Sequence, residues 1–137
     1  MKNKLKDGCI LLARVIEESA IWRDDLHLLK LFMYLILHAR HNKKPKRYPG
    51  FEVKRGELVT SLNDIAEANE WLEHNAVRRW SRQKVSRMLV KLEKQGRVSL
   101  IADTYGTHLR VCNYETYQNL EAYKADRSGT VVEQYRA

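Results

Sequence analysis

The spacing of apolar residues predicts helices through the first two thirds of the chain and a β-hairpin after them. The clearest segment runs from 81 to 96, where Ser81 is a good helix cap and Gly96 a good helix end. Between them, apolar residues recur at helical spacing at Val85, Met88, Leu89 and Leu92. We expect an amphipathic helix here, with one buried face and one face in solvent.

Two further helices are expected before this one. Residues 26–39 are apolar around most of a helical circumference, and Asp24 and Asp25 precede them as caps whose charge suits the helix dipole. Ser61 followed by Asp64 resembles a capping box and predicts the start of the next helix. The longest helix is expected to form the centre of the core.

Turn and strand patterns occupy other parts of the chain. Residues 40–50 hold both prolines and a glycine among charged residues, which indicates an exposed basic loop. Residues 57–60 alternate in polarity and predict a short strand. Two β-prone runs, 98–102 and 107–113, are separated by a turn in which Gly106 can take a positive φ, so we expect a hairpin.

Two segments each allow two structures. Residues 8–22 fit a short packing helix or an extended arm, and residues 67–79 either lengthen the second helix or form an extra turn. The order helix, helix, hairpin predicts a mainly α fold with a small β-hairpin (α+β), of the winged helix-turn-helix type. This domain is expected to span residues 1–118 and to be followed by a helical or frayed tail, 119–137.

Positive charge is concentrated in two segments. The 137 residues carry a formal net charge of +8 at pH 7. Residues 40–55 contain seven basic residues and one acidic residue, Glu52. Residues 78–97 contain eight basic residues and one acidic residue, Glu93, so these two segments account for all of the excess positive charge of the chain. Such clustering favours a polyanionic partner, most commonly a phosphate backbone, although basic helix faces also occur without a ligand.

Other classes of protein fit the sequence poorly. The longest apolar run, 28–37, is far shorter than the roughly 20 residues of a membrane span. The first residues lack the pattern of a secretory signal, so we expect a cytoplasmic protein with no membrane partner, in which Cys9 and Cys112 are reduced thiols. His38 and His41 form the only close histidine pair and have no cysteine nearby. We therefore expect no metal, no cofactor and no enzymatic activity.

Five stretches of the sequence occur together in a familiar order. They are GCILLARVIEESAIW from Gly8, LLKLFMYLILHARH from Leu28, EVKRGELVTSLNDIAE from Glu52, RRWSRQKVSRMLVKLEKQGRV from Arg78 and VCNYETYQ from Val111. In this the chain resembles the winged-helix domain of phage and prophage replication-initiation proteins, the replisome organisers related to the N-terminal domain of the DnaD type. The resemblance implies origin or fork DNA binding, often with self-association, by a protein that helps to bring in the replicative helicase.

The third helix carries the main candidate DNA contacts. If it enters the major groove, residues at its N-terminal end meet base edges, which indicates Arg82, Gln83, Ser86 and Arg87. Arginine can bond guanine at two acceptors, and glutamine can pair with adenine in a similar way. Lys84, Lys91 and Lys94 are expected to contact phosphates. The alternative is a solvated basic face with no ligand.

Further candidates lie outside this helix. They are Arg79 before it, the loop residues Arg40, Lys43, Lys44, Lys46 and Arg47 with Tyr48 against a sugar, and His108 and Arg110 in the hairpin. The loop fits a mobile solvated segment equally well, and Asp103 near the hairpin turn weighs against insertion into a minor groove. Trp22, Trp71 and Trp80 are expected to be core or interface anchors, with Trp80 at the entry to the third helix.

These features predict a protein that binds double-stranded DNA in phage- or prophage-type replication initiation, with itself and other replication proteins as further partners. A transcriptional regulator of the same fold is one alternative. A module that assembles a replication complex without contacting DNA is another. The basic, poorly apolar face of the third helix disfavours this second alternative, because partner surfaces usually have an apolar centre.

Overall fold

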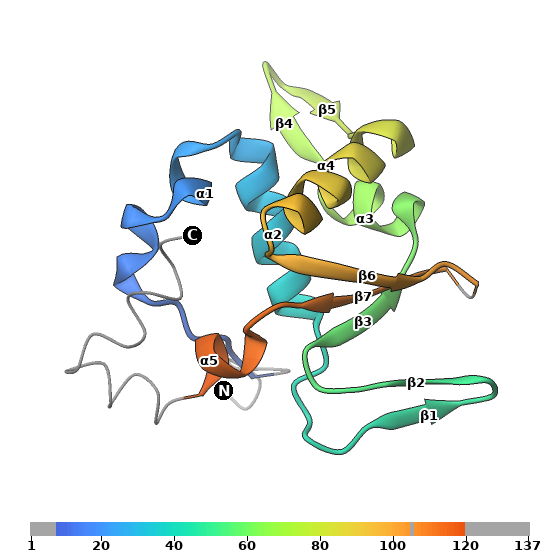
Figure 1. The fold of residues 1–137 in the computed structure, drawn as a ribbon. Helices are drawn as coiled ribbons and strands as arrows, with labels where there is room; N and C mark the ends of the chain where they lie inside the picture. Colours follow the sequence, from blue (N-terminus) through green and yellow to red (C-terminus); the bar gives the residue numbers. More distant parts are fainter. Residues whose placement is uncertain (1–7, 105, 120–137) are drawn as a thin grey trace, which may run out of the picture.

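The computed structural model describes residues 8–104 and 106–119 and shows a small α+β fold in which helices and antiparallel sheets share one core. Its elements are η1 (Arg14–Glu18), α1 (Ala20–Arg23), α2 (Leu26–His38), β1 (Lys46–Tyr48), β2 (Phe51–Val53), β3 (Glu57–Thr60), α3 (Leu62–Ala68), β4 (Trp71–Glu73), β5 (Ala76–Arg78), α4 (Arg82–Lys94), β6 (Val98–Ala102), β7 (Thr107–Val111) and α5 (Tyr114–Gln118) (Figure 1). The expected tail, 119–137, lies outside the described residues except for Asn119.

The expected helix caps are confirmed at Asp25, Ser61 and Ser81, whereas Asp24, also expected to cap α2, is not its N-cap. The side chain of Asp25 accepts a hydrogen bond from the His27 amide at 2.8 Å at the start of α2. Ser61 begins α3 and Ser81 begins α4 in the same way, each accepting from the amide three residues later. These caps fix where each helix starts, and the start of α4 sets which of its side chains face outward.

The central sheet has three antiparallel strands in the order β3-β7-β6. Leu109 in the middle strand lies opposite Leu58 on one side and Leu100 on the other, and all three side chains point to the same face. Figure 1 shows α2, α3 and α4 on that face and the β1–β2 hairpin across the sheet from them. The sheet therefore separates the two most basic segments of the chain.

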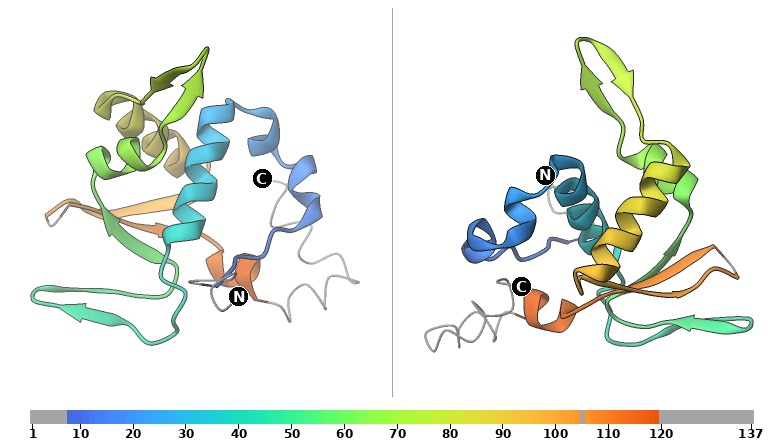
Figure 2. Two further views of the ribbon diagram at one scale, coloured as in Figure 1. Left: turned by 180° about the vertical axis from the view of Figure 1, so that it is seen from behind. Right: turned by 45° about the horizontal axis from the view of Figure 1, so that its top comes forward.

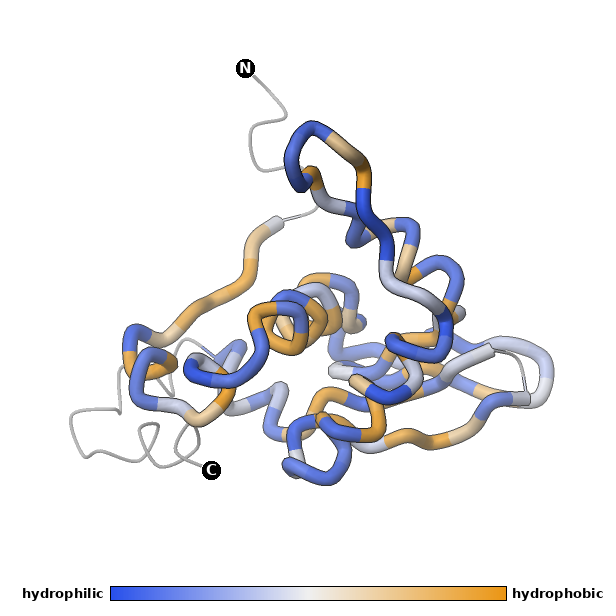
Figure 3. The backbone as a smooth tube through the Cα atoms, turned by 90° about the horizontal axis from the view of Figure 1, so that it is seen from above, coloured by the Kyte–Doolittle hydropathy of each residue, from blue (hydrophilic) through white to orange (hydrophobic). Residues whose placement is uncertain are grey.

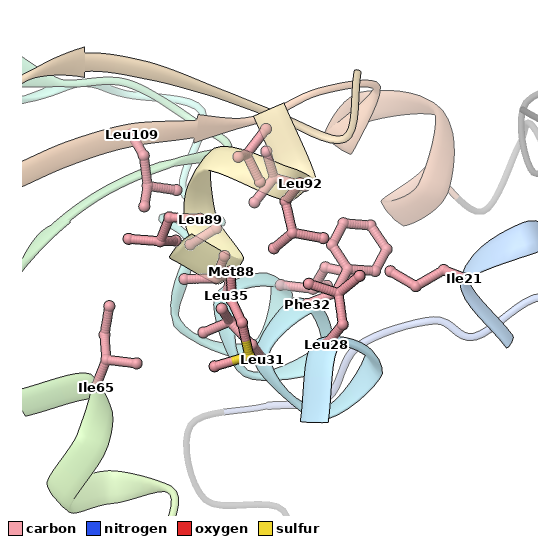
Figure 4. Close-up of a cluster of buried hydrophobic side chains, with 14 of the residues drawn as sticks. Ile21, Leu28, Leu31, Phe32, Leu35, Ile65, Met88, Leu89, Leu92 and Leu109 are labelled. Atoms are coloured by element: carbon pink, nitrogen blue, oxygen red, sulfur yellow. The ribbon is translucent and has the colours of Figure 1, made fainter. Parts of the chain in front are cut away.

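The core is built around α2, as expected. Leu31 and Leu35 are fully buried on this helix, which runs through the middle of the described chain when seen from above (Figure 3). Side chains from α1, α3, α4 and β7 meet them there, including Ile21, Ile65, Leu89, Leu92 and Leu109 (Figure 4). No helix in the described ranges is long and apolar enough to cross a lipid bilayer.

The expected fold class, a mainly α winged helix-turn-helix with one small hairpin, is wrong. The described residues form seven strands in three antiparallel sheets, and two of these sheets are hairpins that the sequence pattern did not predict. Residues 40–50 were expected as a loop, but they contribute β1 to the first hairpin. Its turn is formed by Pro49 and by Gly50 at a φ of 86°, a conformation that glycine adopts without strain.

The second unpredicted hairpin replaces the expected extension of the second helix. α3 ends at Ala68, and β4 and β5 then pair with Leu72 opposite Val77. His74 and Asn75 at the turn both have positive φ, 52° and 65°, as a two-residue hairpin turn of type I′ requires. The hairpin projects away from the body directly before α4 (Figure 2).

The N-terminal segment forms short helices, η1 and α1, rather than an extended arm. It is held to the end of the described chain by Gln118, whose side-chain oxygen accepts from the Leu11 amide at 2.8 Å. The side-chain nitrogen of Gln118 donates to the Leu11 carbonyl at 3.0 Å. This pair of bonds, with buried Tyr114 and Tyr117, closes the core on that side.

Substitution of Gly106 is expected to destabilise the β6–β7 turn. Its φ is +103°, and a Cβ there would lie 2.6 Å from the carbonyl oxygen of Thr60, which is backbone and cannot rotate away. Gly96 is a matched control, since its φ is +74° and a Cβ meets nothing within 4 Å. Gly106→Ala should lower the free energy of unfolding by about 1–3 kcal/mol more than Gly96→Ala in urea denaturation. Equal losses would contradict the contact.

Candidate nucleic-acid interface

The outward side of α4, which we call the α4 face, is mostly polar and basic, with the apolar Val90 exposed in its middle. The capped helix buries Val85, Met88, Leu89 and Leu92 against the core. The α4 face consists of the exposed residues Arg82, Gln83, Ser86, Arg87, Val90, Lys91 and Lys94. Glu93 on the same helix is also exposed, and its carboxylate accepts a hydrogen bond from the Leu100 amide at 2.9 Å. A shallow groove of about 320 Å³ runs along the C-terminal part of this face, from Ser86 to Lys94. The structure thus brings together the third-helix residues that were expected to meet DNA, apart from half-buried Lys84 at the edge of the face.

Three cations on the α4 face have no ion-pair partner among the described residues. Arg82, Arg87 and Lys94 form no ion pair with any carboxylate in the described part of the chain. Lys84 also forms no ion pair in the described part of the chain, but it is half-buried at the edge of the α4 face. Positive charge that is not neutralised within the protein is available to a polyanion.

Lys91 is engaged within the protein. Its Nζ lies 2.9 Å from Oδ1 of Asp24, which directly follows α1, and Gln95 donates to the other carboxylate oxygen at 3.1 Å. The backbone N–H of Asp25 and the ammonium of Lys91 hold the pKa of the Asp24 carboxyl below its usual value. Lys91 therefore ties α4 to the N-terminal helices.

The Asp24 contacts should make stability depend on pH. Because the pKa of Asp24 is lower in the folded than in the unfolded protein, its ionisation stabilises the fold at pH values above the unfolded pKa of about 3.9. This stabilisation is lost as the pH falls through the pKa of the folded protein. Asp24→Asn removes the titrating group, so the variant should lose less free energy of unfolding than the wild type between neutral pH and about pH 3. Equal acid losses in urea denaturation would contradict this role of Asp24.

Two arginines of residues 78–97 are engaged within the protein. Arg97 is buried, with its Nε donating to Gln95 at 3.0 Å and its guanidinium 5.8 Å from the ring centre of Phe32. Burial lowers the pKa of Arg97 from its usual value. Arg79 pairs with Glu70 at the base of the β4–β5 hairpin. These two arginines thus contribute to structure.

The hairpin candidates His108 and Arg110 do not join the α4 face. They flank Leu109 on β7, and because successive strand residues point to opposite faces, both lie on the sheet face away from α4. His108 Nε2 is 2.9 Å from Oε1 of Glu57, and both side chains are largely buried. Arg110 is exposed.

The basic loop candidates lie on the other side of the sheet. Lys43, Lys44, Lys46 and Arg47 precede or belong to β1, and all are exposed. Arg47 is 3.7 Å from Glu52 on the neighbouring strand, whereas the three lysines form no ion pair in the described residues. The structure therefore divides the predicted site residues into two separate basic surfaces.

Sequence reasoning missed two features near α4. Val90 is exposed in the middle of the α4 face, four residues after Ser86, and helical spacing alone would have shown this. His27 lies beneath the start of α4, where the ring N–H of Trp80 donates to its Nδ1 at 3.0 Å. No local pattern links these two residues, which are 53 positions apart.

Trp71 and Trp80 are core anchors, as one of the two expected roles requires. Trp80 is buried at the entry to α4, and Trp71 packs on the core with its ring 4.8 Å from that of His27. Trp22 is 45% exposed, which excludes a role in the core of the described residues and leaves the interface role a prediction. In α1 the buried face is supplied by Ile21 instead.

Within the two described ranges, no three histidine, cysteine or acidic side chains lie close enough together to hold a metal ion. Comparisons of the protein with family models, curated proteins and solved structures find no match. The case for a function therefore depends on the residues and geometry of the chain itself.

Proposed function

We propose that the protein binds duplex DNA through the α4 face and acts in phage- or prophage-type replication initiation. One observation carries the proposal. Arg82 and Arg87, which form no ion pair in the described part of the chain, lie on the exposed N-terminal half of a helix whose opposite face is fixed in the core. A surface of this kind combines charge for the phosphates with side chains that discriminate bases.

The dimensions and chemistry of α4 suit the major groove. That groove is about 12 Å wide and admits a helix of roughly 10–12 Å diameter. Arg82 and Gln83 in the first turn can bond guanine and adenine edges, and Arg87 follows one turn later. Val90 can contact a thymine methyl, while Lys84 and Lys94 can reach phosphates.

The anchoring of α4 supports binding without large rearrangement. Trp80 holds its first residues to His27, and Lys91 holds its second half to Asp24. A helix fixed at both ends loses little conformational freedom when it binds, so more of the interaction free energy appears as affinity.

The role in replication depends on the five stretches that resemble replication-initiation proteins. A transcriptional regulator would use the same α4 contacts, because this kind of contact does not specify the process it serves. Genes for a helicase or its loader beside the gene for this chain would favour replication, and a promoter overlapping its binding site would favour transcription.

Substitution of two lysines tests the phosphate contacts of the α4 face. Removing one phosphate interaction should make the slope of log affinity against log salt less steep by about 0.9. Lys84→Ala with Lys94→Ala should therefore reduce the slope by about 2, and weaken duplexes of all sequences equally. Arg14→Ala with Arg23→Ala is the control, since it removes the same charge from exposed positions in η1 and α1. An unchanged slope, or an equal effect of the control, would overturn the assignment.

A further inference from the structure

The second basic surface has the features of a binding site of its own. We infer that the groove between the β1–β2 hairpin and the end of α2 binds a single nucleic-acid strand, with a base stacked on Tyr48 and phosphates on nearby lysines. This site lies across the central sheet from the α4 face (Figure 1) and does not depend on duplex binding there.

The groove has the size and lining of a ligand site. Its volume is about 690 Å³, and Arg40, His41 and Lys46 line it together with Tyr48 and Glu57. The Nε of Arg40 donates to the Lys44 carbonyl at 2.9 Å, and His41 Nδ1 lies 3.0 Å from the hydroxyl of Tyr114. These contacts hold the loop before β1 in a defined shape.

Lysines lie in and beside the groove: Lys46 lines it, and Lys43 and Lys44 lie in the loop between the lining residues Asn42 and Lys46. Lys43, Lys44 and Lys46 form no ion pair in the described part of the chain. The carboxylate of Glu57 in the lining is already engaged, since its Oε1 accepts from the Lys54 amide at 3.1 Å and lies 2.9 Å from His108 Nε2. The uncompensated cations can therefore bind successive phosphates of a strand.

An aromatic pair provides the surface for a base. Tyr48 and Phe51 lie opposite each other in the hairpin, and their rings stack at 4.8 Å with an angle of 9° between the planes. Phe51 leans on His108 of the central sheet at 6.1 Å, while Tyr48 is 39% exposed beside the groove. The hairpin thus presents a supported ring to solvent.

A base can take the place of the cation now above this ring. Lys46 Nζ lies 5.2 Å from the ring centre of Tyr48, in an exposed contact that holds the ammonium only weakly. Stacking of a base on an aromatic side chain is the stronger of the two interactions. The displaced Lys46 ammonium can then pair with a phosphate, so the Tyr48 ring and the ammonium each interact with the strand.

The aromatic pair favours a single strand over a duplex. Bases in a duplex are stacked on their neighbours and offer only their edges to a protein, whereas a single strand exposes base faces. Basic residues alone would suit either ligand. Tyr48 stacked on Phe51 beside the lysines distinguishes this surface from the α4 face, which has no exposed aromatic residue.

Binding of fluorescent oligothymidylate to the full chain tests the role of Tyr48. Tyr48→Ala should weaken binding about tenfold, as the loss of one stacked base predicts. Tyr48→Phe keeps the ring and should bind as the wild type does. Trp22→Ala is the control for loss of an exposed aromatic elsewhere and should have no effect. If Tyr48→Ala binds like the wild type, the site is overturned.

Substitution of the three lysines tests the phosphate contacts. For single strands each contact contributes about 0.7 to the salt slope, so replacing Lys43, Lys44 and Lys46 by alanine should reduce it by about 2. Substitution of Arg14 and Arg23 by alanine should leave the slope unchanged. An unchanged slope in the lysine variant would overturn the inference.

Competition experiments separate this site from the α4 face. An abasic strand should compete poorly with fluorescent oligothymidylate. If it competes as well as unlabelled oligothymidylate does, the phosphates alone are bound, and the stacking of a base on Tyr48 is contradicted. Arg82→Ala with Arg87→Ala should leave oligothymidylate binding unchanged whether or not duplex binding exists. Loss of strand binding in that double variant would place the strand on α4 and contradict a separate groove.

Discussion

Replacing Arg82 and Arg87 together by alanine is expected to weaken binding to a preferred duplex by about 30-fold or more. Each arginine bonded to a guanine contributes about 1–3 kcal/mol of discrimination, and a loss of about 1.4 kcal/mol is tenfold in affinity. Both side chains are exposed and without an ion pair in the described residues, so their loss should leave the free energy of unfolding nearly unchanged. The measurement is fluorescence anisotropy with labelled duplexes.

The same variant distinguishes base contacts from general charge. Binding to the preferred duplex should fall further than binding to unrelated duplexes, because only the former involves base contacts as well as charge. Arg14→Ala with Arg23→Ala removes equal charge from η1 and α1 and should have little effect. Equal losses in the two double variants would show that α4 has no special role.

Replacing Trp80 by alanine is expected to lower the free energy of unfolding by about 3–5 kcal/mol. This ring is 3% exposed, lies 6.2 Å from that of Trp71 and donates its N–H to His27. Indole nitrogen only donates, so His27 must accept through an unprotonated Nδ1, and truncation leaves this acceptor without its bond. The substitution should also loosen the start of α4 and reduce duplex affinity.

Two controls separate the parts of the Trp80 effect. Trp22→Ala removes an equally large ring from an exposed position and should change stability by about 0.5 kcal/mol or less. Trp80→Phe keeps much of the packing but removes the donor, so an intermediate loss of about 1–3 kcal/mol is expected. Urea denaturation measures all three, and a Trp80→Ala loss no larger than that of Trp22→Ala would contradict its anchoring role.

The parts of the fold that follow from local patterns were predictable. Ser81, the apolar repeat that follows it and Gly96 define α4 almost to the residue, because caps and helical spacing depend on neighbours in the chain. α2 and the β6–β7 hairpin follow from the same kind of signal. The polar residues of the α4 face could also be predicted, since a capped amphipathic helix has only one way to bury its apolar stripe, but the exposed Val90 was missed.

The β1–β2 and β4–β5 hairpins could not be predicted, because neither has the local sequence pattern that usually marks a hairpin. The β4–β5 turn uses His74 and Asn75 rather than the Asn-Gly or Asp-Gly pairs that usually mark such turns. β1 consists of Lys46, Arg47 and Tyr48, all exposed, so it lacks the alternation that indicates a half-buried strand. Pairing with a partner strand decided the structure in both places.

The division of the basic residues into two surfaces could not be predicted either. Which face of a sheet a residue occupies changes with a shift of one position in register. His108 and Arg110 lie away from α4 because Leu109 between them faces the core, and His108 meets Glu57 from 51 positions away. Contacts at such separations leave no trace in local composition.

Titration of the isotope-labelled protein with a duplex, followed by amide chemical shifts, tests the central claim most directly. Duplex binding by the α4 face predicts that the largest shift changes fall on residues 81–94, with small changes in η1 and α1. Loss of these changes in the Arg82→Ala, Arg87→Ala variant is also predicted. An absence of shift changes at saturating duplex and low salt, or changes centred away from α4, would contradict the account.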